Sequence, residues 1–192
     1  MKTYEQFLGQ KIQAYDFIGM LEKQGYSVSI PIDIEAILKD FLEIKYEVKP
    51  DFKNMKVTGS ISVQDGAPYI WVNPMKNTSK ERKRFTLAHE LGHFMLHMAP
   101  TNDLNNFDPI TDTVISFNRD DNWDYTEMEA NNFAAQLLMP SSSIKENTKK
   151  IINSDPNITK ESLVEQLAYL FQVSETAMKF RLTKLGIKGL IV

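Results

Sequence analysis

The spacing of apolar side chains divides the first half of the chain into helices followed by strands. From residue 4 to residue 23, apolar side chains recur every three or four positions, which predicts an amphipathic helix. Asp33 is placed to cap a second, short helix. Residues 43–48 alternate between polar and apolar and predict a strand. The segment 57–74 has two β-rich runs around an Asp-Gly turn, so we expect a hairpin there.

Helical patterns dominate the second half of the chain. Residues 78–98 and 125–140 each carry apolar side chains at helical spacing, and Pro140 ends the second pattern. Between them, residues 99–122 are rich in Asn, Asp, Thr and Pro and predict a loop, with a short strand over 113–117. A polar segment after Pro140 leads to a pair of C-terminal helices over 158–187.

These elements together predict an α+β fold. It is mostly helical, with a small antiparallel sheet and a C-terminal helical pair. A length of 192 residues is typical of one domain, and 42% hydrophobic content is enough for a buried core. We expect a single domain over residues 1–192. In it, residues 1–50 supply the N-terminal helices and first strand, 55–140 the central core, and 158–187 the helical pair.

Charge and cysteine content exclude several classes of protein. The net charge of −3 gives no strong overall attraction to nucleic acids or membranes. The absence of cysteine excludes disulfides and thiolate ligands, so a metal site would need His, Asp or Glu. The N-terminus has no apolar signal core, and no apolar run approaches the ~18 residues of a membrane span. We therefore expect a cytoplasmic protein.

All three histidines of the chain lie in the stretch "TLAHELGHFMLH". His89 and His93 are four residues apart in a predicted helix, so both imidazoles can reach one zinc ion. Glu90 follows the first histidine and can act as general base on a zinc-activated water, which is the arrangement H-E-x-x-H. Gly92 lies in the middle of this helix, where glycine costs about 1 kcal/mol relative to alanine. We infer that another backbone approaches closely at Gly92.

A catalytic zinc site needs a third protein ligand. His97 is excluded on a straight helix, because the side chains at positions 89, 93 and 97 would span about 12 Å. The helix "EMEANNFAAQLLMP" offers Glu127 and Glu129. We prefer Glu127, because Asn131 lies one turn after it and can orient a ligating imidazole. His97 is then expected to be structural, capping the helix end or bonding a loop.

The two motifs together resemble the ImmA/IrrE family of zinc metallopeptidases, over about residues 55–187. The resemblance implies a zincin-like fold with a gluzincin-like site, in which His89, His93 and Glu127 bind Zn²⁺ and Glu90 is catalytic. Family members are typically bacterial or encoded by phages, and they are associated with cleavage of helix-turn-helix repressors. The resemblance therefore implies an endopeptidase whose substrate is a transcriptional repressor.

Two features of the substrate site remain open in the sequence. A donor to the oxyanion should exist, and Tyr125, Asn132 and Arg119 are nearby candidates. The strand predicted within residues 68–73 could bind the substrate by adding it as a further strand.

A competing interpretation makes the protein a DNA-binding regulator. The two C-terminal helices meet at Val173-Ser174 in a manner similar to a helix-turn-helix. The second helix is basic, as phosphate contact requires; its cations are Lys179, Arg181, Lys184 and Lys188. We favour instead a helical hairpin that packs under the catalytic helices, because its apolar positions suit a core. A third interpretation keeps zinc only as a structural or sensing ion, and the intact Glu90 argues against it.

Overall fold

The N-terminal helices form part of one hydrophobic core with the two central helices. The computed structural model describes residues 3–104, 107–113 and 125–187. A 3₁₀ turn, η1 (Thr3–Phe7), precedes α1 (Ala14–Lys23), and α2 (Ile34–Ala36) continues directly into a π-helical turn, η2 (Ile37–Phe41). Asp33 caps α2 by accepting a hydrogen bond from the backbone N–H of Ala36 at 3.0 Å, as the sequence predicts.

The sheet has four strands in the order β1-β3-β2-β4. They are β1 (Lys45–Val48), β2 (Val57–Gln64), β3 (Ala67–Val72) and β4 (Ile110–Thr113). The expected hairpin is confirmed, since β2 and β3 pair antiparallel. Its turn residues Asp65 and Gly66 both have positive φ, as a two-residue hairpin turn of type I′ requires.

The sheet is mixed, and differs in one strand from the antiparallel sheet expected. β1 pairs with β3 in parallel, whereas β2 pairs antiparallel with both β3 and β4. The second strand of the hairpin, β3, lies between β1 and β2. Because the hairpin turn reverses the chain direction after β2, β3 runs in the same direction as β1. The short strand expected over 113–117 begins earlier, at Ile110, and residues 114–117 lie outside the described residues.

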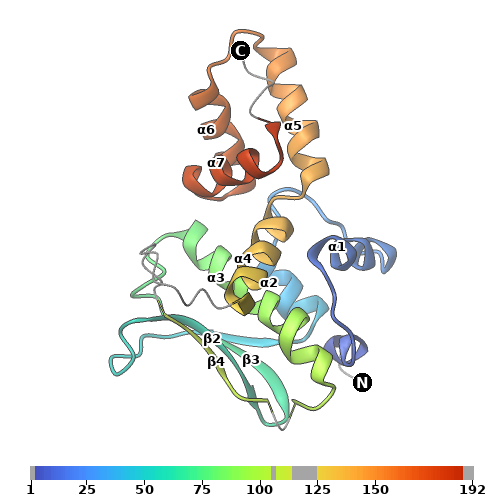
Figure 1. The fold of residues 1–192 in the computed structure, drawn as a ribbon, viewed down its shortest axis with the longest axis vertical. Helices are drawn as coiled ribbons and strands as arrows, with labels where there is room; N and C mark the ends of the chain where they lie inside the picture. The colour runs from blue at the N-terminus through green and yellow to red at the C-terminus, as the bar shows by residue number, and fades with distance from the viewer. Residues whose placement is uncertain (1–2, 105–106, 114–124, 188–192) are drawn as a thin grey trace.

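Two long helices cross at the centre of the molecule (Figure 1). They are α3 (Lys80–His93), which a π-helical turn η3 (Phe94–Met98) and a 3₁₀ turn η4 (Ala99–Thr101) extend, and α4 (Tyr125–Leu138). A methyl group built on Gly92 would lie 3.1 Å from the Cα and carbonyl oxygen of Ala130. The close approach predicted at Gly92 is therefore confirmed, and it brings the two backbones together.

Three helices lie together at the end of the molecule away from the sheet (Figure 1). They are α5 (Ser141–Ser154), α6 (Lys160–Phe171) and α7 (Glu175–Lys184). The apolar spacing predicts α6 and α7, whereas residues 141–157 were expected to be only a polar segment. Helix α5 forms there because Ile144 and Thr148, four residues apart, give it a narrow buried face.

The mixture of helices with a small sheet confirms the α+β class. Within the described ranges, no helix combines the length and apolarity needed to cross a membrane.

Candidate active site

Helix α3 carries the histidine motif into the interior. Ser79 caps its start by accepting a hydrogen bond from the N–H of Arg82 at 3.2 Å. From Thr86 to His93 every residue of the helix is buried. The side chains of Glu90 and His93 have no exposed surface, and His89 is only 6% exposed. Buried polar side chains of this kind need partners, and α4 supplies them for the two histidines.

Helix α4 brings Glu127 to the two histidines that the sequence pairs. The Nε2 atoms of His89 and His93 lie 3.0 Å apart. The Glu127 carboxylate lies 3.3 Å from His89 Nε2 through Oε2 and 3.1 Å from His93 Nε2 through Oε1. Among the described residues, these three form the group whose ligand atoms could hold one metal ion.

The spacing of these atoms fits a metal ion. Donors placed about 2.05 Å from a zinc ion at the corners of a tetrahedron lie about 3.3 Å from one another. The three observed separations, 3.0, 3.1 and 3.3 Å, are close to that edge length. Two imidazole nitrogens and a carboxylate oxygen are also ligands that zinc accepts, and they leave a fourth position open.

Asn131 orients the first histidine, as the E-x-x-x-N spacing predicts. Its Oδ1 lies 3.1 Å from His89 Nδ1. Because an amide oxygen only accepts hydrogen bonds, His89 Nδ1 is the donor in this contact, which in a neutral imidazole leaves the Nε2 lone pair for a metal ion.

Glu129, the alternative third ligand, lies elsewhere. It pairs with Lys11 at 2.8 Å and with His97 Nε2 at 3.1 Å. The hydrogen bond from Lys11 is the largest cause that lowers the pKa of the Glu129 carboxyl. His97 was expected to cap the helix or bond a loop, but its Nδ1 lies 3.1 Å from His93 Nδ1. Burial lowers the pKa of the His97 imidazole, and the hydrogen bond to Glu129 opposes that shift.

Strand β2 packs directly against Glu90, a contact that the sequence analysis missed. A methyl group built on Gly59 would overlap Glu90 Oε1 and lie 2.7 Å from Thr86 Cγ2. An isolated glycine within a strand pattern is the available signal for such an approach. The register between β2 and β4 also shifts between Val57 and Gly59, as at a β-bulge. Bulges are over-represented beside active sites.

A buried amide network holds the hairpin against α3. Thr86 Oγ1 donates to Asn77 Oδ1 at 2.6 Å, and Asn77 Nδ2 donates to the carbonyl oxygens of Thr58 and Asn73, each at 2.8 Å. Asn73 Nδ2 in turn donates to the carbonyl of Val57 at 3.0 Å. These bonds tie the start of β2 to the helical turn before Glu90.

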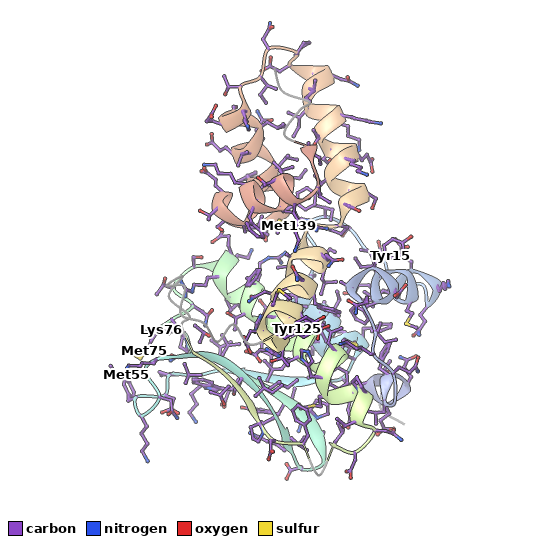
Figure 2. The ribbon with its side chains drawn as sticks, in the orientation of Figure 1. Tyr15, Met55, Met75, Lys76, Tyr125 and Met139 are labelled. Atoms are coloured by element: carbon purple, nitrogen blue, oxygen red, sulfur yellow. The ribbon has the colours of Figure 1, made fainter. Side chains whose placement is uncertain are left out.

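The candidate oxyanion donors have different surroundings. Tyr125 is 64% exposed at the first turn of α4 (Figure 2). Asn132 Oδ1 accepts a hydrogen bond from Lys184, which joins α4 to α7. Arg119 lies outside the described residues.

The basic residues of α7 are largely engaged within the protein. Arg181 is buried and its Nε donates to the carbonyl of Met139 at 3.0 Å, at the junction of α4 with the C-terminal helices (Figure 2). Lys184 contacts Asn132, and Lys179 pairs with Glu175 at 3.5 Å. Lys188 lies outside the described residues. This arrangement favours the packed helical hairpin over phosphate contact.

Comparison with known proteins identifies the family of this chain. A search of curated proteins found no match. The profile of Peptidase_M78, the IrrE N-terminal-like domain, matches residues 46–183. That range includes both helices of the site and the sheet. It is a peptidase family, and the cluster of His89, His93 and Glu127 is compatible with a metal site in it. The chain therefore belongs to the IrrE N-terminal-like peptidase family.

Proposed function

We propose that this protein is a zinc-dependent endopeptidase in which His89, His93 and Glu127 bind Zn²⁺ and Glu90 is the general base. The observation that carries the proposal is the convergence of three ligand atoms from α3 and α4. Glu90 follows the first of these ligands in the same buried helix. A purely structural zinc site would need no carboxylate of this kind.

The donor set favours zinc over calcium and magnesium. Two imidazoles and one carboxylate suit zinc, whereas calcium and magnesium prefer sites built from oxygen ligands. When bound, zinc supplies Lewis-acid chemistry, lowering the pKa of a water molecule toward neutrality and polarising the scissile carbonyl. Glu90 accepts the proton of the attacking water and then delivers it to the leaving amine. Asn131 keeps the His89 ring in the orientation that binding requires.

An extended substrate would pair with β4 rather than β3. The strand within residues 68–73 was expected to bind the substrate, but β3 lies between β1 and β2 and has a strand on each side. In the described sheet, β4 has a neighbour only on the side of β2. It pairs with β2 at Gly59, the residue packed on Glu90. Adding a peptide strand along β4 would therefore bring it toward the catalytic carboxylate.

We further propose a helix-turn-helix repressor as the protein substrate. This step rests on the family resemblance of the paired motifs. Purified helix-turn-helix repressors, incubated with the zinc-loaded protein, provide the test, and cleavage is followed by mass spectrometry.

Three variants test the metal site and the general base. We expect near-stoichiometric zinc in the wild type and in Glu90→Gln, and loss of zinc in His89→Ala and Glu127→Ala. Glu90→Gln should abolish cleavage of a peptide library prepared from a bacterial proteome. Cleavage that survives Glu90→Gln would refute the role of Glu90, and zinc retained by Glu127→Ala would refute the ligand set.

A further inference from the structure

A chain of contacts leads from the surface to the second ligating histidine. Lys11, just before α1, lies 2.8 Å from Glu129 Oε1. Glu129 Oε2 lies 3.1 Å from His97 Nε2, and His97 Nδ1 lies 3.1 Å from His93 Nδ1. The exposed fraction of these side chains falls along the chain, from 45% for Lys11 to 13% for His97 and zero for His93.

The chemistry of these groups determines where each hydrogen lies. An ionised Glu129 only accepts hydrogen bonds, so His97 Nε2 must be the donor. A neutral His97 then has a lone pair on Nδ1, and His93 Nδ1 must donate to it. The Nε2 atom of His93 is left with its lone pair directed at His89 and Glu127. The Glu129 carboxylate thus sets the tautomer of His93 through His97, which lies between them.

A π-helical turn lies between His93 and the end of the helix, and it contains His97. Helix α3 ends in α-helical form at His93 and continues over Phe94–Met98 with a wider turn, in which the N–H of Ala99 donates to the carbonyl of Phe94. π-Helical turns appear frequently at functional sites. Here the wider turn accompanies a lateral contact between the rings of His93 and His97, whose centroids lie 5.2 Å apart.

We propose that His97, held by Glu129 and Lys11, is a positioning residue that fixes the tautomer and ring orientation of His93 for metal binding. Asn131 contacts His89 directly through its amide oxygen. At His93, the His97 imidazole lies between the Glu129 carboxylate and the proposed ligand. Outer partners of this kind commonly change metal affinity by 10- to 100-fold. The inference rests on the proposed zinc site.

The tautomer of His97 provides a direct test. Nuclear magnetic resonance of isotope-labelled ring nitrogens distinguishes a proton on Nε2 from one on Nδ1. We expect His97 to carry its proton on Nε2 in both the zinc-loaded and the metal-free protein. A proton on His97 Nδ1 would make His97 the donor in its contact with His93 and would overturn the inference.

Zinc affinity, measured by competition with a chromophoric chelator, provides the second test. His97→Ala should bind zinc about 10- to 100-fold more weakly than the wild type. His97→Gln should stay within a few-fold, because its amide oxygen can accept from His93 while its amide nitrogen donates to Glu129. Glu129→Ala, which removes the acceptor for His97 Nε2, should weaken binding, whereas the matched control Glu146→Ala, which breaks an exposed pair with Lys150, should not.

Failures of the two proposals give different results. Equal affinity of His97→Ala and the wild type would refute the positioning role. If His97→Ala does not fold, the zinc affinities of His97→Gln and Glu129→Ala and the His97 tautomer of the wild type decide the matter. A wild-type protein that binds no zinc would refute the proposed function together with the positioning role that rests on it. A wild-type protein that binds zinc, with equal affinity in His97→Ala, would refute the positioning role alone.

Discussion

Adding one methyl group at Gly59 should disable the site without touching any ligand. The methyl of Gly59→Ala would overlap Glu90 Oε1 and lie 2.7 Å from Thr86 Cγ2. Ordinary contact between carbon atoms is about 3.5–4.0 Å, so the neighbours must move by about 1 Å. Strand β2 cannot retreat easily, because Gly59 is paired with Val72 on one side and Asp112 on the other.

The expected loss has two components. Overpacking of a dense interior costs about 1–3 kcal/mol of folding free energy. A displacement of about 1 Å at a reacting group can reduce the rate about 100-fold. We therefore expect kcat/KM for a cleaved peptide to fall about 100-fold, with zinc content unchanged, because the three atoms nearest the added methyl belong to Glu90 and Thr86 and not to a proposed ligand.

Gly19→Ala is the matched control. Gly19 lies inside α1, and a methyl group there meets no atom within 4 Å. It should leave activity unchanged and stabilise the helix by about 0.5–1 kcal/mol. Kinetics, zinc analysis and urea unfolding of the two variants complete the experiment. Full activity in Gly59→Ala would show that β2 does not confine Glu90, and equal losses in both variants would show that the effect is not local.

Three further predictions test the surroundings of the site. Asn131→Ala should weaken zinc binding about 10- to 100-fold in a chelator competition. Asn131→Asp, which still accepts a hydrogen bond from His89 Nδ1, should bind zinc nearly as well as the wild type. Equal zinc affinities in all three proteins would contradict the orienting role of Asn131. Arg181→Met should lower the free energy of unfolding, measured in urea, by about 1–3 kcal/mol, because the carbonyl of Met139 loses its buried donor. Lys179→Ala should change it by less than about 0.5 kcal/mol. A larger loss in Lys179→Ala than in Arg181→Met would favour a surface role for Arg181. Burial raises the pKa of the Glu35 carboxyl, but the hydrogen bonds from Lys83 and Tyr46 outweigh it and hold that pKa below its ordinary value. Its stabilising contribution is therefore present above the unfolded pKa and lost as pH falls through the folded pKa, so Glu35→Gln should flatten the decline of thermal stability in acid, and an unchanged decline would refute this assignment.

Local periodicity explains how much of the fold could be predicted. The helical spacing of apolar residues predicts α3, α4, α6 and α7, and the Asp65-Gly66 turn predicts the hairpin, because both depend on interactions between residues close in the chain. Helix α5 was missed since its buried face is narrow and its composition polar. The parallel pairing of β1 with β3 was missed because the order of strands in a sheet depends on tertiary packing, and β3 lies between β1 and β2.

The candidate site divides in the same way. His89, Glu90 and His93 can be identified together because helical geometry alone places the two imidazoles on one face. Glu127 is reached from sequence through its spacing to Asn131 and through the family resemblance. Its distance to the histidines depends on how α4 crosses α3 at Gly92.

His97 and Gly59 show what only the tertiary structure could decide. Helical spacing agrees with the absence of His97 from the group that could hold a metal ion among the described residues. It does not predict the π-helical turn or the partners Glu129 and Lys11, which come from distant parts of the chain. Gly59 is an ordinary strand residue in the sequence, and its importance arises from the packing of β2 on Glu90. The sequence by itself determined the ligand types and their spacing along one helix. The packing of α4 and β2 on α3 decided how these side chains are oriented and how tightly they are enclosed, because those contacts join residues that no local pattern relates.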